Sequence, residues 1–220
     1  MAAQFPTTFA TERYQLGLGD IAPKHSMLLG ALGRCGYAVE VGLVREDVSA
    51  LTEIAGQPGT REYCPRDIEE RWTNETVAEQ QLGKDGGRGV FVLRNMANNA
   101  IAGFGWTGKS GNDEQKNLPM CENTFAIRLH EDSRGQGLAV PFSKIIVAGS
   151  MSIFRARRIG LETWASNNAA FNSYLKADAK AIKAINAKRP TLDTSKPFDE
   201  ERGKHMTEDT RIYMNYGWSA

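Results

Sequence analysis

The stretch EDSRGQGLAV, from Glu131 to Val140, has small residues at Gly135, Gly137 and Ala139, which alternate with larger ones. The apolar run TFAIRL comes before it and predicts a strand, and the longer apolar run VPFSKIIVAGSMSIF overlaps its end and predicts a helix. A junction between a strand and a helix that lacks large side chains allows a ligand to approach the backbone closely.

The start of a helix is a natural binding site for an anion. Its first amide groups lack partners and its dipole is positive there, which favours phosphate groups in particular. The segment Arg134–Ala139 therefore predicts a phosphate-binding loop, and the alternative is a turn in which glycine serves only the backbone shape. The spacing differs from the G-x-G-x-x-G fingerprint of dinucleotide sites, because Ala139 follows Gly137 by two positions.

The remaining sequence predicts alternating strands and helices. A hairpin is expected from GVFVLRN and AIAGFGWTG, with its turn at Asn98-Asn99. Further strands are expected at 37–44, 122–129, 158–166 and 210–218. Helices are expected at 45–56 with Asp47 as N-cap, at 64–83, and at 167–189, where Pro190 stops the helix; 190–208 reads as a loop.

This order of elements predicts a mixed α/β fold of the α+β-like kind. We expect one domain over residues 37–220, with a central, mostly antiparallel twisted sheet and helices on both faces. Residues 1–36 are expected to form an N-terminal extension with a short helix ending at Gly33 or Gly36.

Composition excludes several classes of protein. The chain has 220 residues and a formal net charge of +1, so no broad field attracts nucleic acid or an acidic membrane. Its three cysteines form no C-x-x-C pair, which argues against a disulfide framework or a zinc site. No apolar run approaches the roughly 20 residues that span a bilayer. We expect a cytoplasmic protein without a metal and without a nucleic-acid or membrane partner.

The run GFGWTGKS at 103–110 matches the phosphate-loop pattern G-x-x-x-x-G-K-S. Such a loop must lead into a helix, whereas the sequence that follows, GNDEQKNLPM, is polar and turn-like. Phe104 and Trp106 alternate with small residues, as in a strand. We therefore assign this run to the hairpin, and a nucleotide-binding protein of the P-loop class is the less favoured alternative.

Two motifs together resemble the GNAT superfamily of N-acetyltransferases. The segment Arg134–Ala139 resembles its R/Q-x-x-G-x-G/A signature, and Asn168, Ala170 and Tyr174 resemble its N-x-A-x-x-x-Y helix. The resemblance is strong over 122–176, fair over 37–121 and absent over 1–36. After Tyr174 the chain departs from the family pattern, because the predicted helix continues where the family begins a strand.

The resemblance implies acetyl-CoA as co-substrate. Its pyrophosphate would bind the loop formed by Arg134, Gly135, Gln136, Gly137, Leu138 and Ala139. Backbone groups of the strand TFAIRL would hold the pantetheine arm, and one N–H near Ile127 or Leu129 would face the carbonyl oxygen. The strand at 122–129 would splay from 160–164. Asn168 would hydrogen-bond the arm, or would serve only as a helix N-cap.

Acetyl transfer to an amine requires a neutral amine, a donor for the carbonyl oxygen and a proton for the leaving thiolate. By resemblance Tyr174 is the general acid, and its phenol, with a pKa of about 10, stays protonated at neutral pH. The alternative is an ordinary core tyrosine. Glu122 is the expected base, or else an exposed strand end; Glu162 and His130 are lesser candidates.

The sequence thus predicts an acyltransferase that moves an acetyl group from acetyl-CoA to a primary amine by direct attack in a ternary complex. The alternative is a non-catalytic member of the fold that binds acyl-CoA as a sensor or scaffold. The acceptor is expected to be a small-molecule or peptide amine, and a homodimer is typical of the family.

Overall fold

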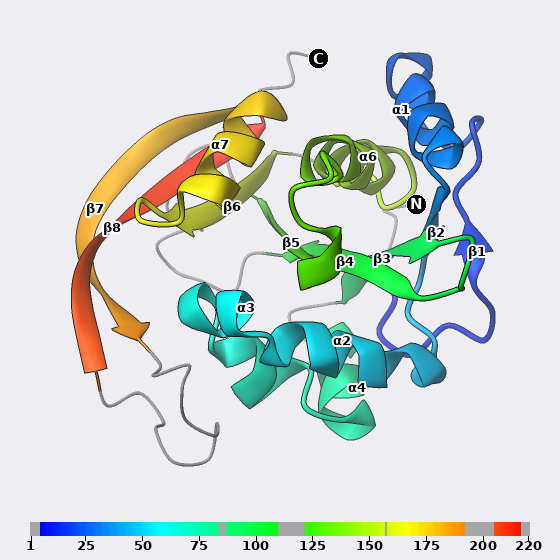
Figure 1. Cartoon of the computed structure of the whole chain (residues 1–220). Coiled ribbons are helices and arrows are strands. Elements are labelled where there is room, and N and C mark those ends of the chain that lie inside the picture. Colours follow the sequence, from blue (N-terminus) through cyan, green and yellow to red (C-terminus); the bar gives the residue numbers. More distant parts are fainter. Residues whose placement is uncertain (1–4, 84–86, 110–121, 157, 192–204, 217–220) are drawn as a thin grey trace.

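The computed structural model describes residues 5–83, 87–109, 122–156, 158–191 and 205–216 (Figure 1). Its centre is an eight-stranded sheet in the order β1-β2-β3-β4-β5-β6-β8-β7. β5 and β6 are parallel, and every other neighbouring pair of the described strands is antiparallel. The strands are β1 (Tyr14–Gln15), β2 (Tyr37–Val41), β3 (Arg88–Asn95), β4 (Ile101–Lys109), β5 (Asn123–Leu129), β6 (Ile159–Trp164), β7 (Ala179–Thr191) and β8 (His205–Tyr216).

Helices cover both faces of the sheet, as Figure 1 shows. One face carries α1 (Pro23–Arg34), α6 (Ala139–Ser152) and α7 (Asn168–Lys176). The other carries α2 (Val48–Gly56), α3 (Pro58–Tyr63), a π-helical turn (Asp67–Arg71) and α4 (Glu75–Gly83). The predicted mixed α/β class with a mostly antiparallel sheet is confirmed. None of the helices in the described ranges has the length and apolar character needed to cross a membrane.

Each face of the sheet has its own apolar core. Under α6 the core contains Phe142 and Ile146 together with Phe125 of β5. On the opposite face Trp72 packs against the hairpin strand β4, with ring centroids 5.6 Å from both Phe104 and Trp106. These two aromatic side chains are buried within β4, so GFGWTGK forms a strand and not the start of a nucleotide loop; Ser110 lies outside the described residues.

The prediction of one helix over 167–189 was wrong. α7 ends at Lys176, and Asp178 then adopts a φ of +72°, a left-handed conformation that Asp tolerates better than most residues. The chain continues as β7, which pairs with β8 along its whole length. The Ala-rich and Lys-rich composition favours a helix only weakly, and pairing with β8 overrides that preference.

The segment 64–83 is also not one helix. It divides into the π-helical turn and α4, and the side chain of Asn74 between them accepts a hydrogen bond from the amide of Val77, 3.0 Å away. Asn is a favoured N-cap residue, so Asn74 begins a new helix instead of continuing the old one.

Contacts at both ends of the sheet fix the position of its outer strands. β1 pairs with β2, and α1 lies against α6, so residues 5–34 contribute Leu16 and Ile21 to the first core. At the other end the long β7–β8 hairpin reaches α3. Arg189 of β7 donates a hydrogen bond to the carbonyl of Glu62 over 2.5 Å, and its guanidinium lies 4.7 Å from the centre of the Tyr63 ring.

Candidate functional site

The sheet opens between β5 and β6. These strands pair only at Asn123↔Ile159 and Thr124↔Gly160, whereas β5 stays paired with β4 along its whole length. The carbonyl of Ile127 accepts from Arg128 over 2.7 Å, and that of Leu129 accepts from Arg134 over 3.2 Å. Polar backbone groups of Ile127 and Leu129 therefore face the opening and not β4, as expected for a splayed strand.

The glycine loop lies at the open end of β5 and leads into α6. Gly135 and Gly137 have φ values of +76° and +77°, and a Cβ atom built on either would meet nothing within 4 Å. Within the described part of the chain, the amides of residues 135–138 donate to no other protein group. These amides lie open at a helix N-terminus, which is the arrangement that binds a phosphate group.

Side chains at the edges of this loop hold its shape. Leu138 is 4% exposed and anchors the start of α6 in the first core. Gln136 accepts a hydrogen bond from the Tyr37 hydroxyl over 2.9 Å and donates to the Asp132 carbonyl over 2.6 Å. These contacts therefore fix the loop before any ligand binds, and the space beside its glycines is open.

Tyr174 lies where the sheet opens. Its side chain comes from α7, is 5% exposed, and meets the Phe125 ring edge-on at a centroid distance of 5.9 Å. The backbone of Ile127 lies close enough to the Tyr174 hydroxyl to lower its pKa slightly. Burial raises the pKa of Tyr174 to about 12, although the charge of Arg128 opposes the rise, so the hydroxyl carries its proton at neutral pH.

An ion pair that the sequence did not indicate supports this strand from the other face. Asp67 is fully buried and binds Arg71 over 2.6 Å and Arg128 over 2.5 Å. Burial alone acts to raise the pKa of Asp67, but the two guanidinium groups hold it below its usual value. Arg128 lies 5.0 Å from the centre of the Trp106 ring and close enough to Tyr174 to affect its pKa.

The sequence around Asp67 gave only a non-specific indication of this ion pair. Asp67 lies in a segment with Ile68 and Trp72, which read as the apolar side of a helix. The π-helical turn, in which the Trp72 amide donates to the Asp67 carbonyl over 2.8 Å, places the carboxylate inside the protein. Irregular turns of this kind are common at functional sites.

Asn168 is the first residue of α7 and is exposed. The N-cap is Asn167, whose side chain accepts from the Ala170 amide over 3.2 Å. The alternative that Asn168 is itself the N-cap is therefore wrong, and its side chain is exposed at the surface.

The acidic candidates lie apart from one another. Glu122 precedes β5, is about half exposed and lies 3.5 Å from Arg158, at the end where β5 and β6 are still paired. Five residues of strand, roughly 17 Å, separate it from Ile127. Glu162 lies on β6 beyond the last pairing with β5, with its carboxylate 3.9 Å from Arg211 and near enough to Cys64 to affect that thiol's pKa. The structure therefore brings Ile127, Tyr174 and the glycine loop together but leaves Glu122 remote.

His130 is engaged by the turn that follows β5. Its Nδ1 accepts from the Asp132 amide over 3.2 Å, and its Nε2 lies 3.5 Å from Glu53. It lines a polar cavity of about 570 Å³ that adjoins the outer side of the glycine loop, where Ser133 and Gln136 also line it.

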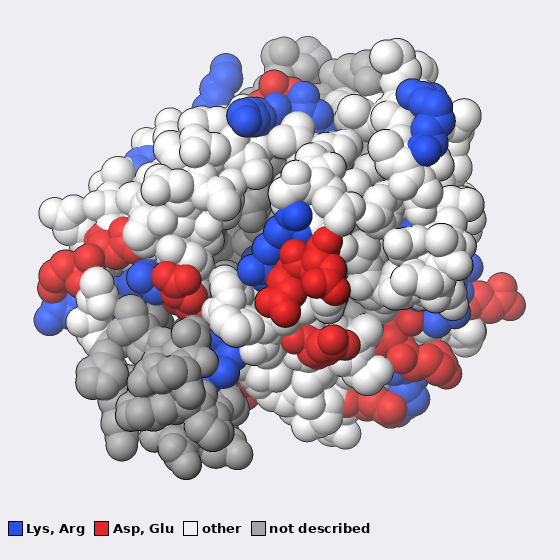
Figure 2. Space-filling view, in the orientation of Figure 1, with Lys and Arg blue, Asp and Glu red and all other residues white. Residues whose placement is uncertain are grey.

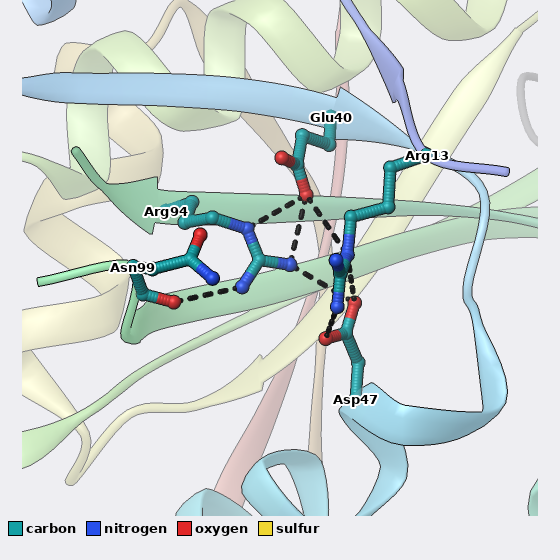
Figure 3. Close-up of polar contacts among 5 residues, drawn as sticks. All are labelled: Arg13, Glu40, Asp47, Arg94 and Asn99. Atoms are coloured by element: carbon teal, nitrogen blue, oxygen red, sulfur yellow. Dashed lines mark hydrogen bonds and ion pairs between the residues drawn. The ribbon is translucent and has the colours of Figure 1, made fainter.

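The same cavity borders a balanced group of charges (Figure 3). Asp47 accepts from Arg13 over 2.8 Å and from Arg94 over 3.0 Å, while Glu40 binds Arg94 over 2.8 Å. Arg94 also donates to the carbonyl of Asn99 in the hairpin turn, over 2.9 Å. Asp47 thus connects the start of α2 to β3, and its side chain does not cap the helix as the sequence predicted. Two cations face two anions, so this group is structural.

The surface is hollowed near the middle of the face drawn in Figure 2, and acidic and basic side chains gather at the edge of the hollow. In the same orientation Figure 1 places α7 on one side of this region, α6 and the turn after β5 on the other, and α3 below. The opening between β5 and β6 is thus accessible from outside.

No family model and no curated protein matches the sequence. Solved structures do match: spermidine N-acetyltransferase from Vibrio cholerae, in complex with CoA and spermine, is 14% identical with a TM-score of 0.60, over 83% of this chain and 96% of that one. A GNAT-family acetyltransferase from Bacillus anthracis is 12% identical with a TM-score of 0.55, over 80% and 93%. The ribosomal-protein-S5-alanine acetyltransferase from Vibrio fischeri is 10% identical with a TM-score of 0.55, over 82% and 92%. The chain therefore has the fold of the GNAT N-acetyltransferases.

Proposed function

We propose that the protein is a cytoplasmic N-acetyltransferase that transfers an acetyl group from acetyl-CoA to a primary amine by direct attack. One observation carries the proposal: an open glycine loop, the exposed N–H edge of β5 and a protonated Tyr174 lie at the same opening in the sheet. A scaffold that needed glycine only for a turn would have no reason to leave the loop amides unpartnered at the start of a helix.

The glycine loop and β5 have different roles in the proposed reaction. Amides of Gly135, Gln136 and Gly137 and the start of α6 hold the pyrophosphate, and the open space at both glycines fits a bulky anion. Acetyl-CoA supplies an acyl thioester that an amine can attack. The Ile127 N–H faces the opening beside the Tyr174 hydroxyl, and we propose that it donates to the carbonyl oxygen when the co-substrate is bound and that oxygen gains negative charge.

Tyr174 is the proposed general acid. Its raised pKa keeps the proton on the hydroxyl in the resting site, so the O–H can donate to the thiolate sulfur as the C–S bond breaks, and the proton that the attacking amine releases restores the phenol. For the base, Glu162 is better placed than Glu122, because it lies on β6 where the strands have separated. Asn168, exposed at the start of α7, is proposed to hydrogen-bond the pantetheine arm.

The proposed acceptor is an amine on a small molecule or a peptide. Both kinds are represented among the solved structures of this fold, by the names spermidine N-acetyltransferase and ribosomal-protein-S5-alanine acetyltransferase. We propose no metal in the reaction, because amide N–H groups and a phenol supply the charge stabilisation and the proton.

The test is calorimetric titration of the protein with acetyl-CoA, CoA and ATP, followed by a thiol-release assay over a panel of amines. We expect binding of both coenzyme A species, no binding of ATP, and release of free thiol with at least one amine. Failure to bind CoA at millimolar concentration would refute the proposal. Binding without turnover of any amine would favour an acyl-CoA sensor of the same fold.

A further inference from the structure

Positive charge gathers on the α3 side of β5, next to Tyr174. Arg71 and Arg128 share a single carboxylate, that of Asp67, which is fully buried between them. The Nε of Arg128 binds this carboxylate and its Nη1 binds the Ile127 carbonyl. One carboxylate facing two guanidinium groups leaves positive charge in excess beside the Tyr174 hydroxyl.

Arg134 adds a third guanidinium group to this side. Its Nη2 donates to the Thr60 hydroxyl of α3 over 3.0 Å, and its Nε donates to the Leu129 carbonyl over 3.2 Å. Neither partner is charged, and within the described ranges no carboxylate forms an ion pair with Arg134. Burial lowers the pKa of Arg134, Glu131 partly offsets this, and the charge of Arg128 lowers it again, so the two guanidinium groups lie near each other.

One acidic side chain on this side of the opening already has a cation beside it. Glu162, on the neighbouring β6, lies 3.9 Å from Arg211. The Arg134 side chain reaches α3 and so leaves the glycine loop free to offer its backbone amides to the pyrophosphate. A guanidinium with spare donors and no ion-pair partner matches the planar, two-oxygen geometry of a carboxylate.

We propose that the acceptor amine also carries a carboxylate, which Arg134 binds, so that the substrates are amino acids or their derivatives and not polyamines. This inference rests on the proposed acetyltransferase function. Arg128 and Arg71 supply the surrounding positive charge and are not themselves required to touch the acceptor.

The same charge has a second effect on the acceptor. Nearby cations disfavour an ammonium group, so the amine loses its proton more easily, as direct attack requires. A polyamine brings further positive charge and is repelled. One group of arginines thus selects the carboxylate and helps to prepare the nucleophile.

The test compares amines that differ in one terminal group: 3-aminopropanoate, propylamine, 1,3-diaminopropane and 2-aminoethyl phosphate, with a set of L-amino acids and their amides. We expect kcat/KM for carboxylate-bearing amines to exceed that for the matched amides and diamines by about 10- to 100-fold, the range for a charge-assisted hydrogen bond. Preference for uncharged amines, for diamines or for the phosphate would overturn the inference.

Substitutions of Arg134 test whether this residue causes the preference for carboxylate-bearing amines. Arg134→Gln is expected to raise the acceptor KM about tenfold and to leave the KM for acetyl-CoA unchanged, with Arg134→Lys retaining part of the preference. Arg66→Gln is the matched control, because the Arg66 side chain is 59% exposed and, within the described residues, pairs only with Glu70. A rise in the KM for acetyl-CoA instead would place Arg134 on the cofactor and overturn the inference. A protein that binds no CoA would refute the proposed function itself, whereas efficient acetylation of diamines would refute only the carboxylate preference.

Discussion

Replacing Tyr174 by phenylalanine removes one oxygen atom from the centre of the proposed site. The hydroxyl belongs to a residue that is 5% exposed, so water has little access to replace it as a proton donor. General acid catalysis by a positioned side chain contributes about 10²- to 10⁴-fold, and we expect kcat to fall by at least about 100-fold. The KM for acetyl-CoA should change little, because the loop amides that hold the pyrophosphate are untouched.

Tyr216 provides a matched control, because it contacts the same aromatic ring as Tyr174. Tyr216 meets Phe125 edge-on at 5.7 Å, compared with 5.9 Å for Tyr174, and is also buried, with 4% exposure. Thiol release would be followed under saturating acetyl-CoA for both variants, with calorimetry to confirm cofactor binding. We expect Tyr216→Phe to keep kcat within a few-fold of wild type. A loss below threefold in Tyr174→Phe, or an equal loss in both variants, would refute the assignment of the acid.

Three further predictions follow from particular residues. Gly137→Ala is expected to weaken CoA binding at least tenfold in calorimetry. The control is Gly36→Ala, because Gly36 has a similar φ of +83° and equally open space, and this variant should lose only about 1 kcal/mol of stability through backbone strain. Equal CoA affinity in the two variants would contradict a phosphate-binding role for the loop. Asp67→Asn should lower the free energy of unfolding by about 3–5 kcal/mol in urea, because two partly buried arginines lose their fully buried anion. A cost under 1 kcal/mol would show that this ion pair is dispensable. The raised pKa of Tyr174 means that the folded state holds this proton more tightly, so stability present below pH 10 is lost as the pH rises toward about 12. The loss is about 3 kcal/mol, and a wild-type stability profile parallel to that of Tyr174→Phe between pH 9 and 12 would rule it out.

Local signals made the core of the site readable from the sequence. Gly135 and Gly137 lie between a strand and a helix that are adjacent in sequence. Their conformation in the turn therefore depends only on residues close to them in the sequence. The Asn98-Asn99 turn was readable for the same reason, and Asn99 does adopt a φ of +60°. The resemblance to a family motif added Tyr174, which periodicity alone could not separate from a core tyrosine.

Features that depend on distant partners were not readable. Asp67 and Arg128 are 61 positions apart, and no pattern within either segment indicates that they meet. The strand at 179–191 resembles a helix in composition, and its partner β8 begins only at His205. The one local signal was Asp178, whose left-handed conformation stops α7, but an aspartate in a polar segment is too common to be decisive.

The contact of Arg189 with α3 has a consequence for how this protein could change its substrate. It fastens the arm formed by β7 and β8 to α3, far along the chain from the glycines proposed to bind the co-substrate. Exchange of that arm for one of another length or charge would therefore change the surroundings of α3 and leave the glycine loop intact. If α3 contacts the acceptor, the choice of amine and the binding of the acyl donor are encoded by separate stretches of the gene.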